Sequence, residues 1–295
     1  MDRKILILGS TGLLGQVLMH EARKRYEVVL GAARKYADLD FDITDDNKLE
    51  QCIQRHAFDV IINCCAIVDH ELCEQNTALA YRINARPSSI IANISREKQI
   101  KYVYISTDGY YHGDYVQKHS EDNEILLLNE YARTKFLGEV LALTNPYSLV
   151  VRTNIVGFRN KVKQPTFVEW AINALQNSEE ITLFEDYYTS SISVAQFSKA
   201  LLDIIEKDCS GIINIASSQV ASKREFIEEL AGQFGFSLKN TKTGSVRTLL
   251  AKRPDSLGLD VSKAENILGY RLPKLKEVIA QLKKEYDYVQ KRNND

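Results

Sequence analysis

Residues 4–15 read KILILGSTGLLG, and this stretch decides the fold. Its initial apolar run predicts a strand in a parallel sheet that is covered on both faces, and a helix is predicted over 12–24. Gly9 permits the tight turn between them, Gly12 lets the backbone approach a phosphate, and Gly15 lets the helix lie close to the sheet. The glycine spacing, GxxGxxG, therefore predicts a dinucleotide-binding turn.

The predicted helix begins directly at this turn. Its first backbone N–H groups and its partial positive charge would therefore face a pyrophosphate. Glycines also mark ordinary turns, but the strand–turn–helix context favours a cofactor site. The residues expected to line it are Gly9, Thr11, Gly12, Leu13 and Leu14.

Short apolar runs alternate with helix-like stretches through the first half of the chain. After the first strand, further strands are predicted at 28–30, 59–63, 101–106 and 148–152. Alternation at this spacing predicts βαβ units, and so an α/β fold built on a doubly wound parallel (Rossmann) sheet.

After about residue 157 the rhythm changes. Helices are predicted over 168–177, 194–207 and 275–288, and a further helix is predicted to begin after a capping box at Ser222. Strands are predicted over 181–183 and 211–215, and the tail from residue 292 is expected to be frayed. We expect a dinucleotide-binding domain of residues 1–157 plus about 192–217, and a smaller C-terminal α+β substrate domain of residues 158–191 plus 218–295.

Composition excludes several classes of partner. The 295 residues carry 38 basic and 39 acidic side chains, a formal net charge of −1, which gives no overall attraction to nucleic acid or to an anionic membrane. No segment approaches the roughly 20 apolar residues of a membrane span. Five cysteines and five histidines show no metal-ligand spacing, so we expect no metal, reduced thiols and a cytoplasmic location.

The residues after the second strand indicate which dinucleotide binds. An NAD(H) enzyme usually carries an acid there for the ribose 2′-hydroxyl. Here Arg34 and Lys35 follow instead, and two cations favour the 2′-phosphate of NADP(H), although both could simply be solvated loop charges. Asp42 and Ile43, just beyond, would hold and flank the adenine.

A tyrosine and a lysine four residues apart carry the predicted chemistry. Tyr131 and Lys135 lie in a predicted helix and share one of its faces. A free phenol has a pKa of about 10, and a neighbouring ammonium lowers the pKa, so that the phenol can exchange a proton at working pH. Ser106 and Thr107 end the fourth strand, at the sheet edge where such folds bind ligands, and Thr107 could polarise a reacting carbonyl.

With these elements in order, the chain resembles the extended short-chain dehydrogenase/reductase family, and within it dTDP-4-dehydrorhamnose reductase and its relatives. The resemblance covers nearly the whole length. The matching segments are the glycine turn, residues 59–66 (DVIINCCA), Ser106-Thr107-Asp108, residues 129–135 (N-x-Y-x-x-x-K), and residues 253–260 (RPDSLGLD).

The resemblance implies a role for each matching residue. Tyr131 would be the proton donor, Lys135 its electrostatic partner and ribose ligand, and Thr107 the substrate-polarising hydroxyl. Asp108 would lie near the sugar. Cys65 and Ala66 would line the cofactor, and Arg253 would bind a nucleotide diphosphate or be a solvated turn residue. The implied activity is NADPH-dependent reduction of a keto carbon on a nucleotide-linked deoxysugar.

Departures from the family pattern leave alternatives open. Gly109 stands where dehydratases of the superfamily carry an acid, which argues against dehydration. Val17 replaces a glutamate of a magnesium-bridged dimer, so a homodimer is left open. A sugar-nucleotide epimerase and an NADP-binding regulatory subunit of a partner enzyme remain alternatives. Trp170 could stack on a nucleotide base or pack in the core.

Overall fold

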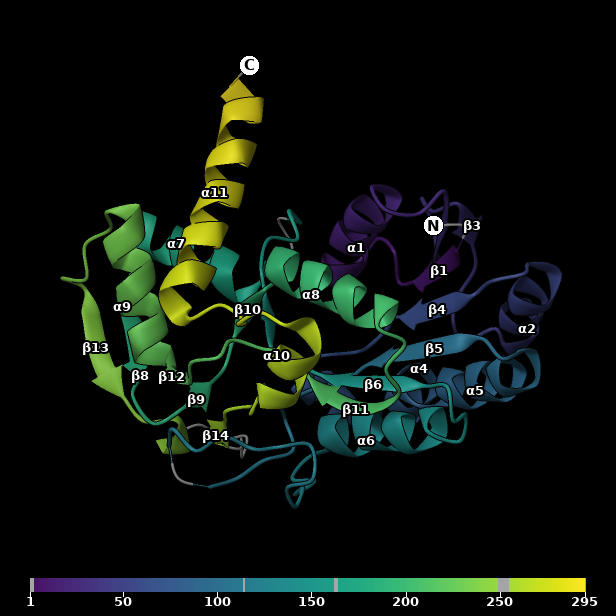
Figure 1. Cartoon of the computed structure of the whole chain (residues 1–295). Helices are drawn as coiled ribbons and strands as arrows, with labels where there is room; N and C mark the ends of the chain where they lie inside the picture. The colour runs from purple at the N-terminus through teal and green to yellow at the C-terminus, as the bar shows by residue number, and fades with distance from the viewer. Residues whose placement is uncertain (1–2, 114, 162–163, 249–254, 295) are drawn as a thin grey trace. The chain divides into compact units, whose positions relative to one another are not determined.

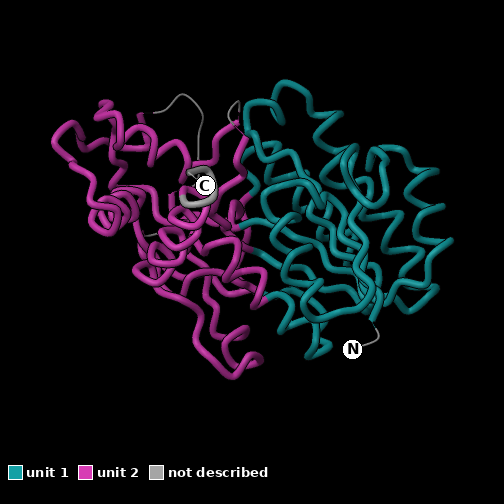
Figure 2. The backbone as a smooth tube through the Cα atoms, turned by 90° about the horizontal axis from the view of Figure 1, so that it is seen from above, with its two compact units in different colours: residues 1–107, 127–152, 201–213 teal, residues 108–126, 153–200, 214–295 magenta. Residues whose placement is uncertain are grey.

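The computed structural model describes residues 3–113, 115–161, 164–248 and 255–294. The chain divides into two compact units of similar length, coloured separately in Figure 2. Unit 1 comprises residues 1–107, 127–152 and 201–213, and unit 2 comprises residues 108–126, 153–200 and 214–295.

Unit 1 is built on a seven-stranded sheet with the order β3-β2-β1-β4-β5-β6-β11. β1 pairs in parallel with both β2 and β4, so the direction in which strands are added reverses between β1 and β4. This confirms the predicted doubly wound parallel sheet. The strands are β1 (Lys4–Leu8), β2 (Val28–Ala33), β3 (Leu39–Asp40), β4 (Val60–Asn63), β5 (Lys101–Ile105), β6 (Leu149–Arg152) and β11 (Gly211–Asn214).

Helices cover both faces of this sheet. Figure 1 shows α1 on one face and α2, α4, α5 and α6 on the other. All four apolar residues of β1 are buried, as expected for a strand covered on both sides. The helices of unit 1 are α1 (Leu13–Arg23), α2 (Asp46–Arg55), α3 (His70–Gln75), α4 (Thr77–Asn84), α5 (Arg86–Lys98) and α6 (Glu130–Ala142).

Unit 2 combines small sheets with helices around its own apolar core. Its paired strands are β7 (Ile155–Val156) with β10 (Ile192–Ser193); β8 (Ile181–Phe184) with β13 (Thr241–Gly244); and β9 (Tyr188–Thr189) between β12 (Ala221–Ser222) and β14 (Ser256–Leu257). The helices are α7 (Phe167–Gln176), α9 (Lys223–Phe234), α10 (Ser262–Leu268), α11 (Leu275–Asn294) and the short 3-10 turn η1 (Val246–Thr248). α8 (Val194–Glu206) begins in unit 2 and ends in unit 1.

Residues 108–126 group with unit 2 because of backbone hydrogen bonds. His119 N–H donates to Gly258 O (2.8 Å), and Asp260 N–H donates to His119 O (2.8 Å). The Asn214 side chain also donates to both His119 O and Asp260 O, each at 3.0 Å. The segment after β5 is therefore tied to the end of β11 and to the residues that follow β14.

Helix ends follow their sequence signals with one exception. The predicted capping box at Ser222 is confirmed, with Glu225 as the reciprocal partner. The last helix is longer than the predicted 275–288, because α11 runs from Leu275 to Asn294 and includes the first residues of the predicted frayed tail. None of the described helices combines the length and apolar character needed to span a bilayer.

Candidate active site

The glycine turn after β1 has the geometry of an anion site. Gly9 has a φ of +77°, which favours glycine, and a Cβ atom on Gly15 would lie only 2.1 Å from Gly9 O. α1 begins at Leu13 with Gly12 as N-cap, and no side chain caps it. The N–H groups of the first turn are therefore available to a phosphate.

The loop after β2 carries the two predicted cations. Arg34 and Lys35 are exposed. An acid that sequence reasoning passed over, Asp38, accepts a hydrogen bond from Gly31 N–H (2.8 Å) and pairs with Arg23 (2.8 Å). The Asp38 carboxylate is thus already bonded to protein groups.

Asp42 and Ile43 follow β3. Asp42 accepts hydrogen bonds from the backbone N–H and the hydroxyl of Thr44, at 2.9 and 2.8 Å. Those bonds lower the pKa of Asp42, and the charge of Arg34 lowers it further. Ile43 packs against the apolar core of unit 1. Arg34 and Asp42 therefore lie near each other.

The end of β4 meets the glycine turn. A Cβ atom on Gly9 would lie 3.0 Å from Cys65 Sγ, so these two predicted cofactor-binding residues are in contact. Asn63 Oδ1 accepts from Cys65 N–H (3.0 Å), and Ala66 follows, partly buried. Burial raises the pKa of both Cys64 and Cys65, so at neutral pH these side chains are small apolar thiols.

α6 begins with a side-chain cap and presents Tyr131 in its first turn. Asn129 Oδ1 accepts from Ala132 N–H (2.9 Å), which gives the asparagine of the N-x-Y pattern a structural role. The ring of Tyr131 lies against that of His70, with centroids 4.7 Å apart. The backbone of α6 and the start of α3 therefore fix the position of this phenol.

Lys135 lies one turn further along α6 and is buried, at 2% exposure. Its Nζ donates to Ile105 O (2.6 Å) and lies 4.1 Å from the centroid of the Tyr104 ring. Burial lowers the pKa of Lys135 to about 8, an effect that Glu139, Cys64 and Cys65 oppose. The ammonium therefore faces the ends of β4 and β5.

Two further features hold α6 against the sheet. A Cβ atom on Gly138 would lie 2.2 Å from the Tyr104 hydroxyl, so only glycine permits this approach. Glu139 forms a buried two-point ion pair with Arg152 at the end of β6, with distances of 3.1 and 2.8 Å. Sequence reasoning missed this pair, because its members lie on different elements.

Ser106 and Thr107 continue from β5 at its carboxyl end, where both are buried. Ser106 N–H donates to Val151 O (2.7 Å), which extends the ladder between β5 and β6. Since Lys135 is bonded to Ile105, the lysine lies at the strand end that leads into Thr107. Unit 1 thus brings this strand end, Lys135 and the glycine turn to one edge of its sheet.

In unit 2, Asp108 is buried, and its Oδ2 accepts from Asn154 Nδ2 (2.7 Å). Burial lowers the pKa of Lys223, on α9, to about 8, and the charge of Asp108 opposes that shift. Trp170 is 42% exposed and lies beside Phe167. Arg253 lies outside the described residues.

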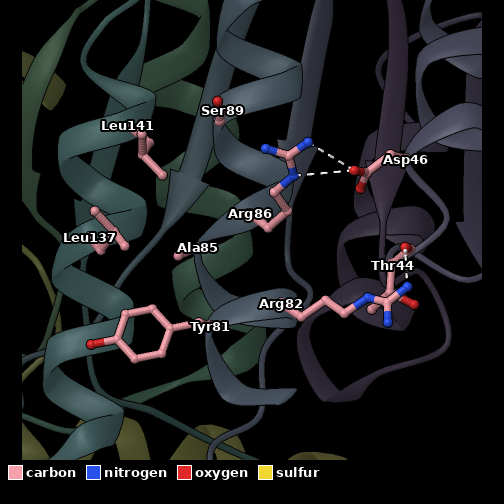
Figure 3. A pocket seen from close by; sticks show the side chains of 9 residues that line it. All are labelled: Thr44, Asp46, Tyr81, Arg82, Ala85, Arg86, Ser89, Leu137 and Leu141. Atoms are coloured by element: carbon pink, nitrogen blue, oxygen red, sulfur yellow. Dashed lines mark hydrogen bonds and ion pairs between the residues drawn. The ribbon is translucent and has the colours of Figure 1, made fainter. Parts of the chain in front are cut away.

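A separate cavity of about 550 Å³ lies on the outer side of α4, α5 and α6 (Figure 3). Arg86 donates to Asp46 across it, and Arg82 donates to Thr44 O. No residue predicted to bind cofactor or substrate lines this cavity. Its lining residues are Thr44, Asp46, Tyr81, Arg82, Ala85, Arg86, Ser89, Leu137 and Leu141.

The chain is similar to known proteins along nearly its full length. It is 26% identical over 287 residues to the "Probable low-salt glycan biosynthesis reductase Agl14" of Haloferax volcanii, covering 94% of this chain and 96% of that protein. It is 24% identical over 284 residues to the "Methionine adenosyltransferase 2 subunit beta" of Pongo abelii, covering 92% and 85%. The crystal structure of dTDP-4-dehydrorhamnose reductase from Bacillus anthracis in complex with NADP superposes with a TM-score of 0.86 at 25% identity, covering 97% of this chain and 100% of that one.

These similarities confirm the resemblance to dTDP-4-dehydrorhamnose reductases that the sequence motifs suggested. The sequence profile of the family described as "RmlD substrate binding domain" matches residues 3–288. This range includes the glycine turn, the Tyr131–Lys135 helix and most of the C-terminal half. The chain therefore belongs to the RmlD substrate binding domain family.

Proposed function

We propose that this protein is an NADPH-dependent reductase that converts a keto group of a nucleotide-linked deoxysugar into an alcohol. The observation that carries this proposal is the position of Lys135: its buried ammonium lies one helical turn from Tyr131 and is bonded to Ile105 O, two residues before Thr107. The named reductases among the similar proteins agree with it.

The residues of unit 1 fit a bound dinucleotide. A side chain at Gly15 would meet Gly9 O at 2.1 Å, and α1 begins without a side-chain cap, so the backbone of the turn can approach a pyrophosphate. Thr11, Leu13 and Leu14 would complete that site, while Cys65 and Ala66 would line the dinucleotide at the end of β4. Bound there, NADPH would supply the hydride.

The proposed preference for NADP(H) over NAD(H) depends on the charged side chains in the loop that follows β2. Exposed Arg34 would pair with the 2′-phosphate, and Asp42 with Ile43 would flank the adenine. Asp38, the acid that could have served a 2′-hydroxyl, is held by Gly31 N–H and Arg23. The NADP bound in the similar Bacillus anthracis reductase supports the same choice.

The chain's own residues would then handle the proton. Tyr131 would donate it to the carbonyl oxygen as that oxygen gains negative charge, and Thr107 would donate a hydrogen bond to the same oxygen. Lys135 would stabilise the phenolate left on Tyr131. Asp108 would contact the sugar, and Arg253 is retained as the proposed ligand of the diphosphate.

The test is NADPH oxidation with dTDP-4-dehydrorhamnose as the probe, followed by identification of the alcohol formed. Tyr131→Phe should lower turnover by a factor of about 10² to 10⁴ while leaving NADPH binding intact. Tyr147→Phe, at a partly exposed loop position, is the matched control. Equal turnover by the Tyr131→Phe variant would remove the assignment.

A second candidate function, regulation of a partner enzyme, is favoured by the similarity to the methionine adenosyltransferase subunit. A regulator would bind the dinucleotide and a partner synthetase without oxidising NADPH in the presence of any sugar nucleotide. An epimerase would invert the sugar without net consumption of NADPH. The same assay, with the sugar products analysed, separates the three functions.

A further inference from the structure

His70 is the first residue of α3, a short helix of unit 1 whose two ends are both held in place. At its start, the side chain of Asp69 caps the helix. At its end, Glu74 Oε1 accepts a hydrogen bond from Glu130 N–H, the first residue of α6 (2.8 Å). The short helix is thereby held beside the first turn of α6, which carries Tyr131.

The imidazole of His70 lies against the ring of the proposed proton donor. The ring centroids of His70 and Tyr131 are 4.7 Å apart, and the two planes are inclined by 42°. Both side chains are half-buried, so the imidazole can exchange protons with solvent while it contacts the phenol ring. Lys135, by contrast, is buried and bonded to Ile105 O. His70 is thus a second group, besides Lys135, that can place positive charge next to Tyr131.

The surroundings of His70 accommodate the charged form of an imidazole. The ordinary pKa of histidine is about 6.5, and an imidazolium within about 6 Å of an aromatic ring is attracted to its face. Carboxylates outnumber cations on α3 and on the two helices that pack against it, and Arg133 is paired with Glu130. The ionisable neighbours are Asp69, Glu71, Cys73 and Glu74 at α3, Tyr81 and Arg82 on α4, and Glu130, Tyr131 and Arg133 in the first turn of α6.

A positive charge beside Tyr131 matters because of what reduction does to the phenol. The proton of the phenol passes to the carbonyl oxygen of the substrate, and a phenolate remains. An adjacent imidazolium stabilises that phenolate more than the neutral phenol, so it also stabilises the transition state in which the proton is leaving. A neutral imidazole gives no such stabilisation. The effect is therefore present below the pH at which His70 titrates and is lost above it.

The contact between the two rings assigns a role to His70. We propose that His70 is a positioning residue that acts on Tyr131 through its charge: protonated His70 stabilises the phenolate and so accelerates reduction at acidic pH. This inference rests on the proposed function for the reaction that is accelerated, but the coupling between the two rings can be measured without turnover.

The first measurement is kcat for NADPH oxidation with saturating dTDP-4-dehydrorhamnose, from about pH 5.5 to about pH 8.5. The wild-type kcat should rise about fivefold as the pH falls through the titration of His70. His70→Phe keeps an aromatic ring against Tyr131, so it should lose this rise while retaining the wild-type kcat at the alkaline end and the affinity for NADPH. His20→Phe, at an exposed histidine of α1, should retain the rise. A rise that persists in His70→Phe, or a loss of kcat that is equal at every pH, would overturn the proposal.

The second measurement follows the imidazole signals of the five histidines by NMR, and the signal that is missing from His70→Phe identifies His70. Tyr131→Leu removes the aromatic ring and should lower the midpoint of the His70 titration by about half a pH unit, whereas Tyr131→Phe should leave the midpoint in place. Equal midpoints in the wild-type chain and in Tyr131→Leu would overturn the coupling. A lowered midpoint in Tyr131→Leu, in a protein that does not oxidise NADPH, would instead count against the reductase and leave the coupling standing.

Discussion

Lys135 Nζ donates a 2.6 Å hydrogen bond to the carbonyl oxygen of Ile105, the last residue of β5. This bond joins the helix that carries Tyr131 to the strand that leads into Thr107. The hydrogen bond from Lys135 to Ile105 O therefore helps to position all three groups proposed for proton transfer, Tyr131, Lys135 and Thr107.

The depressed pKa of Lys135 makes folding stability depend on pH. Between about pH 8 and 10.5 the folded chain has released a proton that the unfolded chain still holds. The free energy of unfolding of the wild-type chain should then rise with pH, relative to Lys135→Met, by up to ~1.4 kcal/mol per pH unit. Urea denaturation of both proteins from pH 7 to 10 measures the difference; a constant difference would contradict the burial of this charge.

The ion pair of Glu139 and Arg152 should be costly to break from one side. Both side chains are at most 3% exposed, so Glu139→Gln leaves a buried guanidinium without its counter-charge. We expect a loss of about 3–5 kcal/mol in the free energy of unfolding. The double variant Glu139→Met/Arg152→Met should recover most of it. A double variant as unstable as the sum of the two single ones would show that the pair is not coupled.

Gly15 and Gly232 are both helical glycines with opposite surroundings. A Cβ at Gly15 meets Gly9 O at 2.1 Å, whereas one at Gly232 meets nothing within 4 Å. Gly15→Ala should destabilise the fold by about 2 kcal/mol and weaken NADPH binding. Gly232→Ala should stabilise it by about 0.5–1 kcal/mol. Thermal unfolding and NADPH titration of the two variants check both directions.

Arg34 should determine the preference between dinucleotides. Arg34→Ala removes the proposed partner of the 2′-phosphate, and we expect about tenfold to a hundredfold weaker binding of NADPH, with NADH binding unchanged. Arg96→Ala, at an exposed position on α5, controls for the loss of a cation. Calorimetric titration with each dinucleotide gives the ratio. An equal loss of affinity for NADPH and NADH would show that Arg34 does not bind the 2′-phosphate.

The sequence predicts those parts of the structure whose signals are local. The strand–turn–helix of residues 4–15 depends on neighbouring residues, and both the turn and α1 are where the pattern places them. The same holds for α6, because Asn129 caps the helix that presents Tyr131 and Lys135. The periodicity of buried strands accounts for the order of β1, β4 and β5 along the chain.

Relationships across long stretches of sequence are not predictable in this way. The Asn214 side chain donates to His119 O although 95 residues separate the two, and nothing near either one marks the other as its partner. The two-residue strands β3 and β14 are too short to show a period. The sequence does not indicate the role of Asp38, because its partners, Gly31 N–H and Arg23, are brought to it by the folded loop after β2.

The polypeptide passes between its two units at 107/108, 126/127, 152/153, 200/201 and 213/214. No single cut in the gene therefore separates one unit from the other. During synthesis the sheet of unit 1 stays incomplete until its edge strand β11 has left the ribosome, and residues 108–126 and 153–200 of unit 2 precede that strand in the chain. Exchanging the whole of unit 2 for that of a relative would require three separate segments, residues 108–126, 153–200 and 214–295, to be replaced together.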